Sequence, residues 1–186
     1  MSGRPRGYDG SMDGTDAHEA DDQQWVERIA ELARAHDVGV AVAESLTAGR
    51  LSASLGRGSE AASWYRGAVV AYASEVKHAV LGVDPGPVVT DGCARQMAEG
   101  VRRLLGADVG IGMTGVGGPG SQEGRPPGTV HLAIADGRGT RSHEVHFEGE
   151  PDEVLASATT LALVELAKAL EPADTHAAAT VGYEGA

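Results

Sequence analysis

The chain has 186 residues, of which 41% are hydrophobic and 23% are charged, values typical of a soluble globular protein and outside the collagen-like and wholly disordered classes. Its 15 Lys and Arg residues against 27 Asp and Glu give a net charge of -12, which disfavours nucleic acid and anionic membranes as partners. No apolar run approaches the roughly 20 residues that span a bilayer, and residues 1–22 lack the apolar segment of a signal peptide. We therefore expect a cytoplasmic protein.

Composition divides the chain into a core region and two tails. Residues 1–22 contain six acids, two Arg and no Val, Ile or Leu, so we expect them to be disordered. Residues 172–186 are rich in Ala and lack a core pattern, so we expect a flexible tail. One domain over residues 23–171 remains, a length that suits a single hydrophobic core.

Apolar periodicity predicts alternating helices and strands along this domain. Trp25, Ile29 and Leu32 recur at the spacing of one helix face, which predicts a first helix over 23–36. The same spacing predicts further helices over 47–55, around Val76 and Val80, from Thr90 to Leu105, and from Pro151 to Lys168. Short, nearly continuous apolar runs predict strands covered on both faces at 38–43, 67–73 and 108–113.

A hairpin is predicted after these elements. The turn sequence Asp136-Gly137-Arg138-Gly139 separates two candidate strands, 130–135 and 142–147. Helices interleaved with buried strands indicate an α/β layered fold. The hairpin makes its sheet mixed rather than purely parallel.

The first polar cluster, Glu44-Ser45-Leu46-Thr47, follows a predicted buried strand and leads into a helix. Hydroxyl groups beside free backbone N–H groups at such a place suit an anion or an oxyanion. The simpler interpretation is that Ser45 and Thr47 only cap the helix, which is the commonest role of Ser and Thr there. A carboxylate at the end of a covered strand needs a partner, so Glu44 shifts the balance toward a functional site.

The second cluster contains Tyr72 at the end of its strand and Lys77 about one helical turn into the next element. A Lys near a Ser acts as a general base when burial or a nearby cation lowers its pKa. Composition alone favours the other interpretation, in which Lys77 is solvated and Tyr72 belongs to the core.

The third cluster is the glycine-rich segment Thr114-Gly115-Val116-Gly117-Gly118-Pro119-Gly120, which continues to Arg125 and Gly128. Nine of the 27 glycines lie between positions 106 and 128. Backbone N–H groups in such a loop can approach a phosphate or carboxylate closely, although a flexible turn explains the glycines equally well. The segment is not a Walker A loop, since no Lys-Ser/Thr follows the glycines, and no G-x-G-x-x-G opens a helix here.

Neither a metal site nor a cofactor is predicted. His143 and His146 face opposite sides of one strand, and no third ligand joins His131 and His146. Cys93 is the only cysteine and falls within an apolar helical stripe, so we expect a small buried hydrophobic residue there.

The three clusters, taken in order, resemble one family. The matching blocks are Ala43-Glu44-Ser45-Leu46-Thr47-Ala48-Gly49, Tyr65-Arg66-Gly67, Val69-Val70-Ala71-Tyr72 with Glu75-x-Lys77, Leu81-Gly82-Val83, Thr114-Gly115-Val116-Gly117-Gly118-Pro119 and Pro127-Gly128-Thr129-Val130. Over about Trp25 to Leu170 the chain resembles the CinA C-terminal family, the nicotinamide-nucleotide amidohydrolases or NMN deamidases. It departs from the family pattern at Ala48, where Gly is frequent.

The resemblance implies a three-layer α/β/α sandwich and a homo-oligomer. It also implies that the substrate is nicotinamide mononucleotide, whose carboxamide is hydrolysed to nicotinate mononucleotide and ammonia in pyridine-nucleotide salvage. On this basis we hypothesise that Ser45 attacks the carboxamide carbon while Lys77, helped by Tyr72, removes its proton.

The substrate-binding residues expected beside these three are Glu44, Thr47, Gly49, Thr114, Gly115, Gly118 and Arg125. Backbone N–H groups from Thr47 onward would hold the oxyanion, and Glu44 would favour the pyridinium cation of the substrate. The Thr114 to Gly118 segment and Arg125 would receive ribose and phosphate.

Three alternatives stay open. In the first, Glu44 activates water directly and Ser45 only donates a hydrogen bond. In the second, the chain is a non-catalytic nucleotide-binding or regulatory module of the same fold. In the third, it is an amidase for another small amide.

Overall fold

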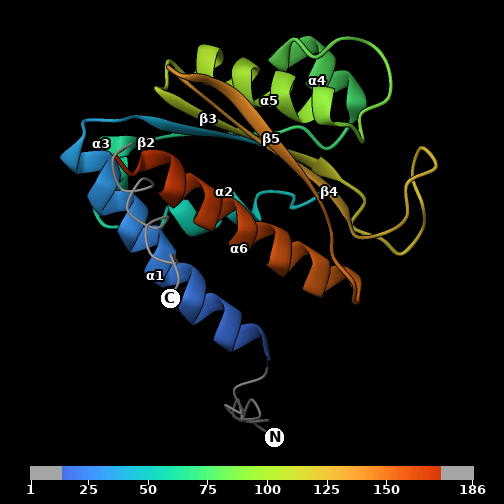
Figure 1. Ribbon diagram of the computed structural model, residues 1–186, viewed down its shortest axis with the longest axis horizontal. Coiled ribbons are helices and arrows are strands. Elements are labelled where there is room, and N and C mark those ends of the chain that lie inside the picture. The colour runs from blue at the N-terminus through green and yellow to red at the C-terminus, as the bar shows by residue number, and fades with distance from the viewer. Residues whose placement is uncertain (1–13, 173–186) are drawn as a thin grey trace, which may run out of the picture.

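Five strands form one sheet in the order β2-β1-β3-β4-β5 in the computed structural model, which describes residues 14–172 (Figure 1). The strands are β1 (Val40–Glu44), β2 (Tyr65–Val70), β3 (Val109–Gly115), β4 (Thr129–Asp136) and β5 (Gly139–His146). β1 pairs in parallel with β2 and β3, whereas β3 with β4 and β4 with β5 are antiparallel. The predicted hairpin and the predicted mixed sheet are both confirmed.

Helices cover both faces of this sheet. They are α1 (Gly14–Ala35), α2 (Arg50–Leu55), α3 (Ala61–Trp64), α4 (Ser74–Leu81), α5 (Asp91–Leu104) and α6 (Pro151–Leu170). α1 and α6 lie side by side on one face together with α2 and α3, and α4 and α5 lie on the other (Figure 1). The chain is thus an α/β fold with three layers, as predicted.

Alternate residues of each central strand divide the core between the two faces. Val40 and Val42 pack with α1 and α6, whereas Ala41 and Ala43 pack with α5. The layer between β3 and α5 is thin, because a Cβ atom added at Gly112 would lie 2.3 Å from the carbonyl oxygen of Ala94. Part of the glycine excess therefore serves helix–sheet packing and not the loop that follows β3.

Three sequence predictions are corrected. α1 begins at Gly14, so residues 14–22 are helical and not disordered. The reason is a tertiary contact that composition does not reveal: Asp22 is 5% exposed and accepts a 2.6 Å hydrogen bond from the Thr160 hydroxyl of α6. Trp25 is 36% exposed while Val26 is fully buried, so the buried face of α1 contains Val26 in place of Trp25 and includes Ile29 and Leu32 as predicted. β2 is an edge strand with largely half-buried residues rather than a strand covered on both faces.

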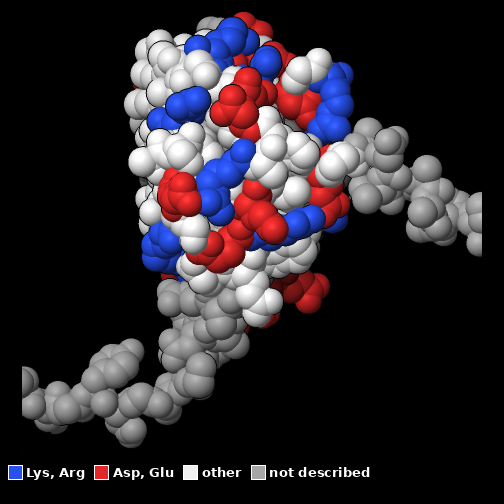
Figure 2. All heavy atoms as spheres, turned by 90° about the vertical axis from the view of Figure 1, so that its left-hand side faces the viewer, with Lys and Arg blue, Asp and Glu red and all other residues white. Residues whose placement is uncertain are grey.

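The predicted tails fall mostly beyond the described part of the chain. Residues 1–13 and 173–186 lie outside the described residues, so the predictions made for them stay predictions. Among residues 14–172, no helix is both long enough and apolar enough to cross a membrane. Figure 2 shows one end of the molecule, where basic and acidic side chains lie next to each other without a field of a single sign.

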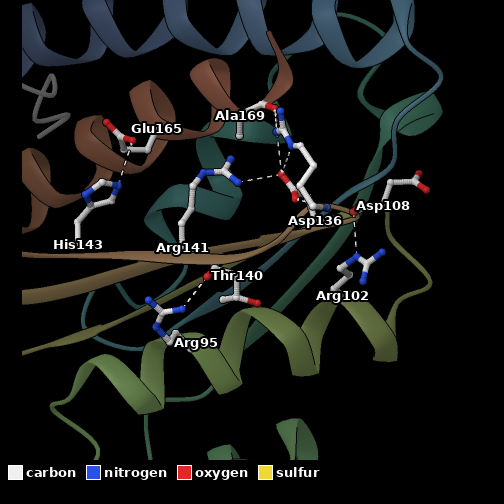
Figure 3. A network of polar contacts seen from close by, with 10 residues as sticks. Arg95, Arg102, Asp108, Asp136, Thr140, Arg141, His143, Glu165 and Ala169 are labelled. Atoms are coloured by element: carbon white, nitrogen blue, oxygen red, sulfur yellow. Dashed lines mark hydrogen bonds and ion pairs between the residues drawn. The ribbon is translucent and has the colours of Figure 1, made fainter. Parts of the chain in front are cut away.

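A polar network joins the β4–β5 turn to the C-terminal end of α6 (Figure 3). The Asp136 carboxylate accepts hydrogen bonds from Arg138 (2.8 Å) and Arg141 (2.9 Å). Arg138 also donates to the carbonyl oxygen of Ala169 in the last turn of α6, at 2.8 Å. Burial raises the pKa of Asp136, but the hydrogen bonds from the two guanidinium groups outweigh burial and lower it to about 2.

We predict that Asp136→Asn lowers the free energy of unfolding at pH 7 by up to about 2 kcal/mol. A carboxylate whose pKa is lowered in the folded state stabilises the fold above its ordinary pKa, and this stability is lost as pH falls from about 4 to about 2. The exposed guanidinium partners make this value an upper bound. Urea unfolding of both proteins tests it. Their difference should shrink between pH 4 and pH 2, whereas a difference independent of pH would contradict a role for the charge.

Candidate functional site

The three polar clusters meet in one cleft of about 430 Å³, at the end of the sheet where β1 and β3 finish. Five predicted site residues line it: Ser45, Tyr72, Thr114, Gly115 and Gly118. The other lining residues are Leu46, Val88, Val116, Gly117, Gly120, Ser121, Gln122, Pro151 and Leu155. A hollow of about 410 Å³ near Asp136 and Arg138 contains none of the predicted site residues. We therefore take the cleft as the candidate site because predicted site residues line it, and not because of its volume.

Glu44, the last residue of β1, is fully buried and holds the turn that follows the strand. Its carboxylate accepts four hydrogen bonds from this turn and the start of α2. The donors are the Thr47 hydroxyl (2.7 Å) and the backbone N–H groups of Gly49 (3.1 Å), Leu51 (3.1 Å) and Ser52 (2.8 Å). The buried charge is thereby compensated by donors of its own chain, as buried carboxylates require.

This arrangement gives Glu44, Thr47 and Gly49 a structural role in the turn, and their predicted contacts with substrate stay predictions. None of the three lines the cleft, and their polar groups bond one another. The predicted oxyanion donors are also largely occupied, because the N–H groups of residues 48 to 52 already have acceptors. The interpretation that Thr47 caps α2 is wrong. The Thr47 hydroxyl donates to the Glu44 carboxylate, and it is this carboxylate that accepts the N–H groups at the start of α2.

Ala48 lies within this turn in the left-handed conformation, with φ of 50°. A residue with a Cβ atom adopts that conformation at a cost of about 1 kcal/mol. The departure from the family pattern at this position therefore places a local backbone strain in the turn. The four bonds to Glu44 hold the turn against this strain.

Ser45 begins the turn and faces the cleft. Ser45 is 7% exposed, and its hydroxyl forms no hydrogen bond among the described residues. Several backbone N–H groups of cleft-lining residues also lack an acceptor in the described part of the chain, among them those of Leu46, Gly117 and Gly118. Free donors beside a hydroxyl suit an oxyanion, so these groups join the N–H groups predicted from the sequence as candidate donors.

Lys77, on α4, is 1% exposed although its side chain carries an amine. Its Nζ donates to the carbonyl oxygen of Ala71 at 2.8 Å and to that of Tyr72 at 3.4 Å. Burial lowers the pKa of Lys77, opposed by the nearby Cys93, Glu123 and Glu75. The interpretation of Lys77 as a solvated surface residue is wrong, and the burial that a general base requires is present.

Tyr72 follows β2 and is 73% exposed, so the alternative that it belongs to the core is wrong. It lines the mouth of the cleft, and its carbonyl oxygen accepts from Lys77. Its hydroxyl forms no hydrogen bond within residues 14–172. The help that Tyr72 gives to proton transfer stays a prediction.

Some residues of the third cluster line the cleft, and others lie outside its lining. Thr114 and Gly115 lie at the end of β3, where the Thr114 hydroxyl donates to the carbonyl oxygen of Val88 at 2.8 Å. Gly115 is required by packing, since an added Cβ atom would lie 2.3 Å from the carbonyl oxygen of Thr129. Arg125 does not line the cleft and pairs with Glu144 on β5 at 3.3 Å, so its predicted contact with the phosphate stays a prediction.

Two other chemistry-bearing residues lie outside the cleft lining. Cys93 is buried, as predicted, and burial raises the pKa of its thiol to about 11, so it stays protonated at neutral pH. His131 is fully buried, and neither ring nitrogen has a hydrogen-bond partner in the described structure. In that same part of the chain, no group of three or more His, Cys, Asp or Glu side chains is arranged to hold a metal ion.

Sequence reasoning missed several residues of the cleft wall. Pro151 and Leu155 come from the first turns of α6, far along the chain, and only the packing of α6 brings them to the cleft. Glu123 is a different case, because an acid inside a glycine-rich loop was visible in the sequence. Its carboxylate accepts from the backbone N–H groups of Val88 and Val89.

Comparisons with known proteins find similar sequences and structures. The family model described as the CinA C-terminal domain matches residues 22–170. A CinA-like protein of Frankia casuarinae is 41% identical over 129 residues, which make up 67% of this chain and 30% of that protein. A putative competence-damage inducible protein of Bacillus subtilis is 38% identical over 134 residues, 69% of this chain and 32% of that protein. The chain thus spans about a third of the length of these relatives.

Solved structures are similar over almost their whole length. A competence-damaged protein (CinA) superfamily protein from Klebsiella pneumoniae is 30% identical, with a TM-score of 0.77 over 80% of this chain and 97% of that one. A competence or damage-inducible protein from Enterobacter asburiae is 28% identical, with a TM-score of 0.78 over 81% of this chain and 98% of that one.

We predict that Glu44→Gln lowers the free energy of unfolding by about 3 kcal/mol, because an amide has one acceptor oxygen and leaves buried N–H groups unpaired. Urea unfolding measures the change. Glu148→Gln is the matched control, since Glu148 is exposed and its loss should change stability by less than about 0.5 kcal/mol. Unchanged stability with lost activity would instead restore the alternative in which Glu44 activates water.

Proposed function

The chain belongs to the CinA C-terminal domain family, and from this premise we propose that it hydrolyses the carboxamide of nicotinamide mononucleotide to nicotinate mononucleotide and ammonia. One observation carries the proposal: an almost fully buried Lys77, which does not itself line the cleft, bonds the chain just after β2, next to the end of β1 where Ser45 lines the cleft. A hydroxyl and a buried amine are the parts that an amidase of the serine–lysine type needs.

The strand register relates the two residues. β1 and β2 are parallel with Glu44 opposite Val70, so Ser45 and Ala71 follow next on the two strands. The pairing continues past the strand ends, since the Ala71 N–H donates to the Glu44 carbonyl oxygen at 2.7 Å. Lys77 bonds the carbonyl oxygen of the same Ala71. The Lys77 amine thus bonds the residue that follows β2, and that residue lies opposite Ser45, which follows β1.

The hydrogen bonds of Lys77 can accommodate its neutral form. A neutral amine has two N–H bonds and one lone pair. The carbonyl oxygens of Ala71 and Tyr72 accept two N–H bonds, which leaves the lone pair for the proton of an attacking hydroxyl. Burial acts in the same direction, because it lowers the pKa of the amine.

Hydrolysis then proceeds in two steps. In the first, the Ser45 oxygen bonds to the carboxamide carbon, its proton passes to Lys77, and Lys77 returns a proton to the departing nitrogen as the C–N bond breaks and ammonia leaves. In the second, water attacks the Ser45 ester, with Lys77 taking a proton from water and giving one back to the Ser45 oxygen. Nicotinate mononucleotide is released.

The free N–H groups of Leu46, Gly117 and Gly118 are the proposed donors to the oxyanion and to the phosphate. A cleft of about 430 Å³ falls in the range of small-molecule sites. With Arg125 paired to Glu144, phosphate recognition depends on backbone donors rather than on a strong local cation. We further propose a cytoplasmic homo-oligomer.

We predict that the folded protein releases ammonia from nicotinamide mononucleotide and that Ser45→Ala reduces this by about 10⁴-fold or more. Nicotinamide and glutamine serve as comparison substrates in the same ammonia assay. The absence of release from the mononucleotide by wild type would contradict the proposed substrate. Equal release by Ser45→Ala would contradict the nucleophile alone.

We predict that kcat/KM rises with pH through a midpoint below 10.5, the ordinary pKa of Lys, because the active form of Lys77 is neutral and burial lowers its pKa. Lys77→Met retains the apolar stem without the amine and should reduce kcat/KM by about 10²- to 10⁴-fold. If kcat/KM of Lys77→Met depended on pH as that of wild type does, a group other than Lys77 would be titrating.

A further inference from the structure

The glycine-rich loop closes on itself in a tight turn at Glu123. The backbones of Gln122 and Arg125 bond each other in both directions, at 3.1 and 2.9 Å. The two residues between them, Glu123 and Gly124, both have positive φ, 51° and 75°. Glu123 is thus held in a conformation that residues other than glycine seldom adopt, and contacts of its side chain must offset that cost.

Those contacts join the loop to the segment that precedes α5. The Glu123 carboxylate accepts the Val88 N–H on both oxygens, at 3.0 and 2.9 Å, and the Val89 N–H at 2.9 Å. Val88 is a wall residue of the cleft and is 2% exposed. Its carbonyl oxygen in turn accepts from the Thr114 hydroxyl. One carboxylate therefore connects three parts of the cleft wall that are distant in sequence.

We propose that Glu123 is a positioning residue of the cleft, one that ties the glycine-rich loop to Val88 and Val89 and so fixes the loop N–H groups against the bound nucleotide. This inference rests on the proposed function for its substrate, and on the three hydrogen bonds for its geometry. Gln122, beside Glu123 in the turn, lines the cleft, so release of the turn would displace a wall residue directly.

Glu123 also acts on Lys77 through charge. Three groups raise the pKa of the Lys77 amine against burial, namely Cys93, Glu123 and Glu75. Removal of the Glu123 charge should therefore lower the pKa of Lys77 further. The neutral base would then be reached at a lower pH, so the rising limb of kcat/KM should move toward acid.

Three substitutions separate the hydrogen bonds from the charge. Glu123→Gln removes the charge and one acceptor, and we expect KM for nicotinamide mononucleotide to rise about tenfold, together with an acid shift of the rising limb. Glu75→Gln is the matched control, because Glu75 lies on α4 near Lys77 but does not bond the loop. It should shift the limb and leave KM within twofold. Glu123→Asp retains the charge on a shorter side chain. The rising limb of kcat/KM against pH should therefore lie where it does in wild type, while KM should remain raised.

Hydrogen exchange gives a readout that does not depend on turnover. The Val88 and Val89 amides should exchange about tenfold faster or more in Glu123→Gln than in wild type, while β3 amides keep their protection and so report an intact fold. Unchanged exchange at Val88 and Val89, or an unchanged KM despite faster exchange, would overturn the proposal. If wild type does not hydrolyse the mononucleotide, the proposed substrate fails, and the exchange comparison alone still decides whether Glu123 holds the loop.

Discussion

One buried carboxylate, that of Glu44, sets the geometry of the candidate site. A charge removed from water must find several donors, and the nearest are the free N–H groups at the beginning of α2. The chain therefore turns sharply directly after β1, so that α2 starts beneath the carboxylate. Ser45 is at the outside of this turn and faces the cleft. The acid that seemed a candidate for chemistry is the residue that positions the hydroxyl.

The two ends of the sheet carry different kinds of polar interaction. At the end near Asp136, arginines and acids pair with each other and join β4 and β5 to α6 (Figure 3). At the cleft end, some polar groups have no hydrogen-bond partner among the described residues, including the Ser45 hydroxyl and the N–H groups of Leu46, Gly117 and Gly118. Satisfied groups stabilise the fold, whereas unpaired groups around a cavity are available to a ligand. The contrast supports the cleft as the site in a second way, independent of the family.

The layered fold was predictable because its signals are local. Periodicity in α5 and α6, the N-cap at Thr90 and the turn at residues 137 and 138 all depend on a few neighbouring residues. Asp22 shows the limit, since its helix is held by Thr160 on an element at the other end of the domain. Burial at the sheet edge was misjudged for the same reason: the apolar run of β2 does not reveal which strand lies outermost.

The candidate site was predictable in its members and less so in their roles. The family pattern brought Ser45, Tyr72 and Lys77 together, and the burial of Lys77 agrees with that pattern. The roles of Glu44, Thr47 and Gly49 depend on which donor meets which acceptor, and spacing alone does not determine this. Arg125 illustrates the point again, because a loop cation is drawn to whichever acid packs beside it, here Glu144.

The central claim is that the Ser45 hydroxyl is the nucleophile, and an ester on that residue tests it most directly. A single turnover of nicotinamide mononucleotide, quenched in acid and analysed by peptide mass spectrometry, should show the nicotinate mononucleotide acyl group on the peptide that contains Ser45 and none in Ser45→Ala. Complete conversion of substrate in the quenched samples, with no adduct on Ser45 at any time or in slowed variants such as Lys77→Met, would contradict the account.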